Sequence, residues 1–194
     1  ANHIIDNPDV NVVMEVMGGR DPAHDYILRS ISLGKHVITA NKEVMARHGP
    51  DILAAARKKG THVMFEASVG GGTPIIGPLL RDLVANDVIA VRGIINGTTN
   101  YILTRMSENG IEFDAALKEA QELGYAEANP DNDVEGVDAA CKIAILATIA
   151  FRAEMKDTDV YREGITGLKA CDFLYARELG YSIKLISMAR RQDG

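Results

Sequence analysis

Apolar runs and helical stretches alternate through the first third of this chain of 194 residues. Val10–Met17 is a largely apolar run with β-branched residues, and His36–Thr39 and Thr61–Ala67 are shorter runs of the same kind. The stretches between them have helical spacing and end at Gly34 and Gly60. Strand–helix–strand–helix–strand is the order of a doubly wound parallel sheet, whose strands helices cover on both faces. The alternation therefore predicts an α/β fold.

Ligands of such sheets bind at the carboxyl ends of the strands. Those ends carry Gly18 and Gly19 after the first run, and Thr39, Asn41 and Lys42 after the second. The glycine pattern G-x-G-x-x-G, which binds a dinucleotide pyrophosphate, does not occur in the sequence. Lys42 opposes the helix dipole where the next helix starts, so by itself it is most simply a solvated loop lysine.

The segment EASVGGGTP, Glu66–Pro74, follows the third strand. Its three consecutive glycines let the backbone turn sharply or approach a ligand closely. Thr73 as cap and Pro74 at the first helical position predict a helix that runs to Val84. A tight turn between domains and a binding loop are equally good interpretations of these residues.

An acidic stretch leads to a lysine in the second half of the chain. Within twelve residues it holds the carboxylates Glu127, Asp131, Asp133, Glu135 and Asp138. The residues after Lys142, IAILATIAF, are apolar on every side and predict a buried helix. Because a lysine is rarely buried without a partner, Asp138, four residues earlier on the same helical face, is a candidate partner.

The same residues have a purely structural interpretation. Asn132 as cap and Glu135 three residues later could form a capping box at the start of a helix from Asp133 to Phe151. Asp138 and Lys142 could be a surface pair that contributes about 0.2–0.5 kcal/mol. The spacing alone supports function and capping equally.

The overall composition excludes some classes of protein. The net charge is −6, and 46% of residues are hydrophobic, so neither nucleic-acid nor membrane binding is indicated. Two cysteines, Cys141 and Cys171, give no disulfide framework and suit a cytoplasmic location. The opening ANHIIDNP resembles the end of a helix, so we expect the chain to be a piece of a longer protein.

Four motifs in order carry a resemblance to a known family. They are T-x-N-K at Thr39–Lys42, E-A-S-V-G-x-G-x-P at Glu66–Pro74, N-G-T-x-N-Y at Asn96–Tyr101, and A-x3-G-Y-x-E-x2-P-x2-D-x2-G-x-D-x3-K at Ala120–Lys142. Together they resemble the homoserine dehydrogenases over nearly the whole chain. One departure is Asn129 before Pro130, where the family often has aspartate.

The resemblance implies a fold in two parts. Residues 1–66 would be the C-terminal half of an NAD(P)-binding domain, an incomplete Rossmann-type doubly wound sheet whose glycine loop precedes Ala1. Residues 67–194 would form an α+β catalytic, substrate-binding and dimerisation domain with a mixed sheet, continuing beyond Gly194. The strands expected at Val88–Ile95 and Ile183–Ala189 are candidates for the interface of a homodimer.

The resemblance also implies an activity: reversible reduction of L-aspartate 4-semialdehyde to L-homoserine with NADP or NAD, in threonine, methionine and isoleucine biosynthesis. Catalytic roles would belong to Lys142 as acid–base group, Asp138 and Lys42. The substrate would be bound by Glu127, Asp133, Asp138 and Thr98. The cofactor would be bound by Gly18, Gly19, Thr39, Asn41, Lys42 and Gly124. A monovalent cation, usually sodium, would lie at Glu66, Val69, Gly71 and Thr73.

Two other functions remain compatible with the sequence. One is another amino-acid-linked NAD(P) oxidoreductase with the same two-domain plan. The other is a non-catalytic dimerising core that binds substrate, because the glycine loop is absent from the chain. We expect the chain by itself to bind NAD(P) poorly and to turn over no substrate.

Overall fold

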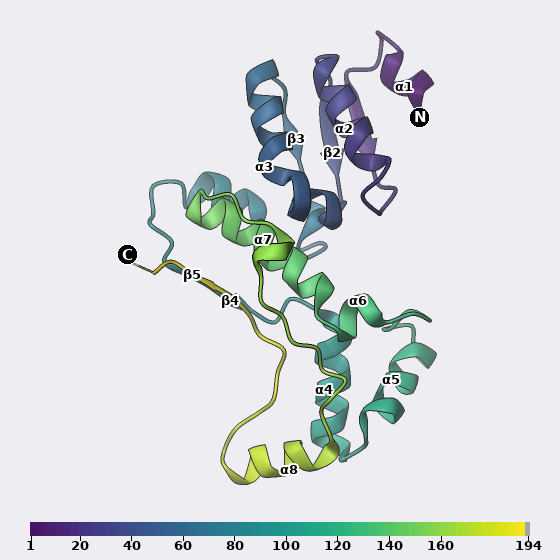
Figure 1. The fold of residues 1–194 in the computed structure, drawn as a ribbon, viewed down its shortest axis with the longest axis vertical. Helices are drawn as coiled ribbons and strands as arrows, with labels where there is room; N and C mark the ends of the chain where they lie inside the picture. The colour runs from purple at the N-terminus through teal and green to yellow at the C-terminus, as the bar shows by residue number, and fades with distance from the viewer. Residues whose placement is uncertain (193–194) are drawn as a thin grey trace. The chain divides into compact units, whose positions relative to one another are not determined.

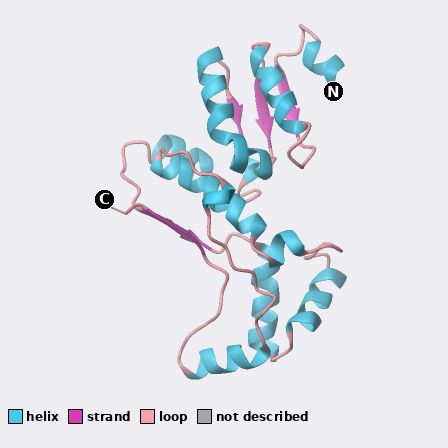
Figure 2. Ribbon diagram, viewed as in Figure 1, coloured by secondary structure: helices cyan, strands magenta, loops and turns pink. Residues whose placement is uncertain are grey.

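The computed structural model describes residues 1–192 as an α/β chain (Figures 1 and 2). The first elements are α1 (Asn2–Asp6), β1 (Val12–Glu15), α2 (Ala23–Ser32), β2 (His36–Thr39), α3 (Lys42–Lys59) and β3 (Val63–Met64). The later ones are β4 (Ala90–Gly93), α4 (Gly97–Asn109), α5 (Phe113–Glu122), α6 (Asp131–Val134), α7 (Val137–Phe151), α8 (Ala170–Glu178) and β5 (Ser187–Arg190). Short helical turns η1 (Glu66–Ser68), η2 (Pro78–Asp82) and η3 (Asp157–Asp159) lie between them.

The chain divides into two compact units, and each is built from separate segments. The first unit contains Ala1–Val91, Cys141–Val160 and the residues from Ala189 onward. The second unit contains Arg92–Ala140 and Tyr161–Met188. Helix α7 and the paired strands β4 and β5 run through both units.

The first unit contains a parallel sheet with the strand order β1-β2-β3. Val13 lies opposite Val37, and Ile38 lies opposite Met64. The predicted α/β class and the parallel pairing of the three strands are confirmed. The strands are shorter than predicted, and β1 lies at the edge of this sheet rather than at its centre.

Helices α2 and α3 lie side by side on one face of this sheet (Figure 1). Ile27 from α2, Ile52 from α3 and Val37 from β2 are fully buried there. Side chains alternate between the two faces of a strand, so Val12 and Met14 point the other way from Val13. They are 49% and 65% exposed. The prediction that helices cover both faces of the first strand is thus wrong for the described residues.

One predicted helix starts slightly later in the structure. The helix expected from Pro74 begins at Ile76 and continues as η2 from Pro78 to Asp82. The reason is that the Glu66 carboxylate, not Thr73, accepts the free N–H groups at this helix start. Helix α4 begins at Gly97, because the Asn96 side chain caps it by accepting from Thr99 N.

The single helix predicted over Asp133–Phe151 is two helices. Gly136 separates α6 from α7 and has a φ of +74°, a left-handed conformation that breaks a helix and that glycine adopts without strain. Pro130, not Asn132, precedes α6, so the expected capping box is not formed. The buried helix itself is confirmed: residues 139–147 of α7 are buried except Lys142, which is half-buried.

The core of the second unit lies where α4 packs against α5, α6 and α8. It contains Ile102, Leu103, Met106, Ala116, Ala120, Ala126, Val134, Ile165 and Phe173. The predicted strands Val88–Ile95 and Ile183–Ala189 are present in shorter form as β4 and β5, which pair with one another. This core fixes the start of α4 and the acidic segment that surrounds α6.

Candidate functional site

A buried carboxylate and a hydroxyl join the ends of β1 and β2. Thr39 is 1% exposed, and its Oγ1 donates to Glu15 Oε2 at 2.7 Å. The same Oγ1 accepts from the backbone N–H of Asn41 at 2.9 Å. Thr39 therefore holds the turn into α3 rather than pointing freely outward. Glu15 was missed by the sequence analysis, although an acidic residue within the apolar run VNVVMEVM was the available signal.

Asn41 connects the loops that follow β1 and β2. Its Oδ1 accepts from Val44 N at 3.1 Å and caps α3, while its Nδ2 donates to the carbonyl of Gly19 at 2.6 Å. Gly18 and Gly19 are exposed, with φ values of +76° and +72°, and a Cβ on either would meet open space. The structure thus brings Gly19, Thr39 and Asn41 together. Lys42 follows as the first, half-buried residue of α3.

Glu66 is fully engaged by the backbone that follows it. Its Oε1 accepts from Ile75 N at 2.6 Å and Ile76 N at 2.8 Å, and its Oε2 accepts from Gly77 N at 2.7 Å. Burial acts to raise the pKa of this carboxyl, but the three N–H donors and the charge of Arg81 outweigh burial, so the net shift is downward.

The other residues predicted to bind a cation lie on the loop between Glu66 and η2. Val69 is buried, Gly71 has a φ of +58°, and Thr73 is exposed and donates its N–H to the Gly70 carbonyl at 3.0 Å. The Glu66 carboxylate faces N–H donors and a guanidinium, so it does not suit a cation. The backbone carbonyls of this loop are the oxygen donors that remain.

In the second unit, Asn96 lies between two carboxylates of the acidic stretch. Its Nδ2 donates to Asp133 Oδ1 at 2.6 Å and to Asp138 Oδ2 at 2.9 Å. Asn96 is 5% exposed and Asp138 is 2% exposed. One amide group, which is also the cap of α4, therefore holds two of the predicted substrate-binding residues together. The motif at Asn96–Tyr101 did not predict this role of the Asn96 side chain.

Three further predicted residues lie around the turn after α5. Thr98 Oγ1 donates to the carbonyl of Tyr125 at 2.8 Å, and Gly124 adopts a φ of +77°. The carboxylate of Glu127 is exposed, while its backbone carbonyl accepts from Gln121 Nε2 at 3.1 Å. Thr98 thus anchors the backbone on which Gly124 and Glu127 lie, and leaves the Glu127 carboxylate accessible.

Asp138 and Lys142 both lie on α7, four residues apart. By the spacing of a helix they share one face. Asp138 is in the second unit and Lys142 in the first. Asp138 is held by Asn96, so its carboxylate has a fixed position beside the acidic segment.

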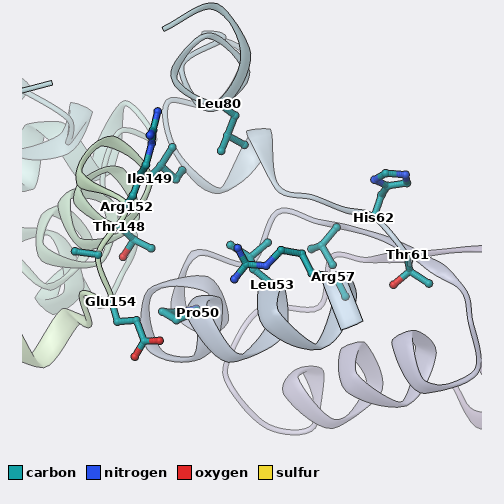
Figure 3. A pocket seen from close by; sticks show the side chains of 13 residues that line it. Pro50, Leu53, Arg57, Thr61, His62, Leu80, Thr148, Ile149, Arg152 and Glu154 are labelled. Carbon is teal, nitrogen blue, oxygen red and sulfur yellow. The ribbon is translucent and has the colours of Figure 1, made fainter. Parts of the chain in front are cut away.

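A hollow in the first unit has a volume of about 480 Å³ (Figure 3). It is lined by residues of α3, β3, η2 and the end of α7, among them Leu53, Arg57, Thr61, Leu80 and Arg152. None of the predicted site residues lines it. The polar side chains at the strand ends and around Asn96 are therefore a better guide to the site than this hollow.

Among residues 1–192, no group of three or more His, Cys, Asp or Glu side chains could hold a metal ion. Likewise, the described helices include none with the length and apolar character needed to cross a membrane.

Comparisons with known proteins agree over both parts of the chain. The family described as "Homoserine dehydrogenase" matches residues 74–192, and "Homoserine dehydrogenase, NAD binding domain" matches residues 1–66. A homoserine dehydrogenase of Synechocystis is 52% identical over 98% of this chain and 44% of its own length. The crystal structure of a homoserine dehydrogenase from Thiobacillus denitrificans is 50% identical, with a TM-score of 0.95 over 98% of this chain and 44% of that one.

A more distant structure was solved with a cofactor. It is a hyperthermophilic archaeal homoserine dehydrogenase in complex with NADPH, 27% identical, with a TM-score of 0.80 over 93% of this chain and 53% of that one. The chain spans less than half the length of the curated relatives that it matches.

Proposed function

The chain belongs to the homoserine dehydrogenase family, and from this premise we propose that it takes part in the reversible NAD(P)-dependent reduction of L-aspartate 4-semialdehyde to L-homoserine. This reaction would be a step of threonine, methionine and isoleucine biosynthesis. The observation that carries the proposal is the pair of carboxylates, Asp133 and Asp138, that the Asn96 side chain holds together. Lys142 follows Asp138 by four residues on α7. The substrate is an amino acid, and its ammonium group requires such acceptors.

The chemistry divides between the cofactor and the protein. A nicotinamide cofactor supplies the hydride when it is bound. We propose that Gly18, Gly19, Thr39, Asn41, Lys42 and Gly124 hold it. The first five lie at or just after the carboxyl ends of β1 and β2, where ligands bind such sheets, and the two exposed glycines leave room for close backbone approach.

Lys142 is the proposed acid–base group. In the reducing direction it would give a proton to the oxygen that becomes the alcohol, and in the other direction it would take that proton back. Asp138 and Lys42 would assist catalysis, while Glu127, Asp133, Asp138 and Thr98 would bind the amino-acid part of the substrate. Support for these roles is the position of Asp138 and Lys142 on one face of α7.

An assay of the full-length protein tests the activity. We expect oxidation of NADH or NADPH with L-aspartate 4-semialdehyde, at a kcat/KM at least about tenfold above that with other small aldehydes. A preference for a different amino-acid aldehyde would indicate another oxidoreductase of the same plan. Absence of turnover with every aldehyde would favour the non-catalytic core.

Replacing Glu127 with alanine is expected to raise KM for homoserine by about 10–100-fold, because a hydrogen bond to a charged group contributes about 1.5–3 kcal/mol. KM for the nicotinamide cofactor should stay within about twofold of wild type. Initial-rate kinetics with each substrate varied in turn measure both values. Glu122→Ala is the matched control, since Glu122 is an exposed carboxylate at the end of the neighbouring α5. An equal rise in both KM values for Glu127→Ala would make its role structural.

We also propose a monovalent-cation site on the loop after β3, formed by backbone carbonyls at Glu66, Val69, Gly71 and Thr73. Carbonyl oxygens are suitable ligands for hard cations. The two glycines, Gly70 and Gly71, have positive φ values, which allow a tightly curved backbone. The Glu66 side chain would shape this loop by capping η2 instead of binding the ion.

The lowered pKa of Glu66 predicts a pH-dependent contribution to stability. A carboxyl whose pKa is depressed on folding stabilises the protein above its unfolded pKa, and that stabilisation is lost as the pH falls through the folded value. The melting temperature of Glu66→Gln should therefore lie below that of wild type at pH 7, and the two should converge as the pH falls below about 4. Calorimetry from pH 3 to 8 measures this. A constant difference across the range would mean that the carboxylate charge is unimportant.

Three broader properties are part of the proposal. Residues 1–66 would be the C-terminal half of the NAD(P)-binding domain, and 67–194 the catalytic, substrate-binding and dimerisation domain. A homodimer would form along the β4–β5 sheet, where Ile89 is 71% exposed and Met188 53% exposed. A cytoplasmic location suits the two free cysteines.

A further inference from the structure

A carboxylate outside every predicted site holds two arginines in the first unit. Asp157 begins the short turn η3 after α7, and its side chain is only 10% exposed. Its Oδ2 accepts from Arg47 Nη2 at 3.0 Å and from Arg20 Nη2 at 3.3 Å. Asp157 Oδ1 also lies 2.9 Å from Arg47 Nε, close enough for strong charge attraction although the two atoms are not aligned as a hydrogen bond.

The two arginines belong to the elements that carry the proposed cofactor residues. Arg20 directly follows Gly19, whose carbonyl is the acceptor for Asn41. Arg47 lies on α3, which Asn41 caps and Lys42 begins. Asp157 thus fastens both the loop after β1 and the first turns of α3 to the segment that follows α7.

Two histidines lie near these arginines. His24 and His48 stack with ring centroids 4.1 Å apart. Burial and then the nearby His24 lower the pKa of His48, Arg47 and Arg20 lower it further, and only Asp51 acts to raise it. Arg20 and Arg47 both contact Asp157 Oδ2, and two guanidiniums so close to one another repel, so they require a counter-charge. Asp157 supplies that charge from a nearly buried position.

We infer that Asp157 is a positioning residue for cofactor binding: it holds the loop of Gly18 and Gly19 against the start of α3 in the arrangement that receives the dinucleotide. This inference rests on the proposed function only for the identity of the ligand, a nicotinamide dinucleotide. Asp157 would not touch the cofactor itself. Its effect would pass through Arg20 and Arg47, because loss of its charge leaves two neighbouring guanidiniums without their shared partner.

Direct titration of the full-length protein with NADPH and NADH tests this. Asp157→Asn keeps the size of the side chain and removes its charge, and we expect Kd for the preferred cofactor to rise about tenfold. Arg20→Gln removes only the contact to the glycine loop, from a side chain that is 42% exposed, and should weaken binding in the same direction without unfolding the protein. Asp157→Glu, which restores the charge, should recover part of the affinity.

The controls separate positioning from stability. Glu154→Gln removes an exposed carboxylate from the same segment and should leave Kd within about twofold of wild type. The double variant Asp157→Asn, Arg20→Gln should raise Kd by less than the product of the two single increases in Kd. The reason is that both substitutions break the same contact between Asp157 and Arg20. If both single variants bind NADPH and NADH like wild type, whatever their melting temperatures, the inference is wrong. A wild-type protein that binds cofactor yet reduces no aspartate semialdehyde would instead refute the proposed activity.

Discussion

Replacing Lys142 with alanine in the full-length protein is expected to lower kcat by about 10²–10⁴-fold, the usual contribution of a placed proton donor. KM for homoserine should change much less, because the ammonium partners Glu127 and Asp133 remain. Alanine has the highest helix propensity, so α7 should keep its structure. Steady-state kinetics and circular dichroism measure the two effects separately.

A second substitution distinguishes proton transfer from charge. Lys142→Arg keeps the positive charge, but a guanidinium does not release its proton at neutral pH. It should therefore be nearly as inactive as Lys142→Ala. Lys118→Ala, on the exposed side of α5, is the control and should retain wild-type kcat. Wild-type kcat in Lys142→Ala would remove this lysine from the mechanism, and high activity in Lys142→Arg would assign it an electrostatic role only.

Changing Asn96 to aspartate is expected to lower kcat/KM for homoserine by more than about 100-fold, since like charges placed side by side cost several kcal/mol. The amide nitrogen lies 2.6 Å from Asp133 and 2.9 Å from Asp138, and a carboxylate there would repel both. The melting temperature should fall by about 5–15 °C at neutral pH.

The pH dependence identifies the cause of that loss. Repulsion among the three neighbouring carboxylates is largest when all three are ionised, so the destabilisation of the variant is largest at neutral pH and shrinks as the pH falls and one of them is protonated. Scanning calorimetry of wild type and variant from pH 4 to 8 measures this trend. Asn109→Asp, at the exposed end of the same α4, should show no such trend. An Asn96→Asp enzyme with wild-type kcat/KM would show that the bridge is dispensable.

Local patterns in the sequence were sufficient to predict most of the helices and strands. The strand His36–Thr39 was predicted with its observed bounds, and α3 ends at Lys59, directly before the predicted stop at Gly60. These elements depend on periodicity, caps and glycine stops, all of which operate over a few residues. The glycine at 136 was visible too, but its left-handed conformation became clear only from the structure.

The features that the sequence did not reveal depend on residues far apart in the chain. Glu66 caps a helix start from nine to eleven residues away, and Asn96 reaches Asp133 and Asp138 over 37 and 42 residues. No spacing rule for a helix or strand connects such positions. The motif at Asn96–Tyr101 carried part of the resemblance, but only the structure shows that the Asn96 side chain both caps α4 and contacts Asp133 and Asp138.

The separation of Asp157 from its partners has a consequence for folding on the ribosome. It is 137 residues from Arg20 and 110 from Arg47, so both arginines emerge long before the carboxylate is made. The parallel strands can pair once β3 has emerged from the ribosome. The contacts of Arg20 and Arg47 with Asp157 can form only after Asp157 has been synthesised. Contacts over such distances form slowly because the intervening chain must first be ordered. During synthesis, the glycine loop after β1 is therefore among the last parts of this unit to reach its final position.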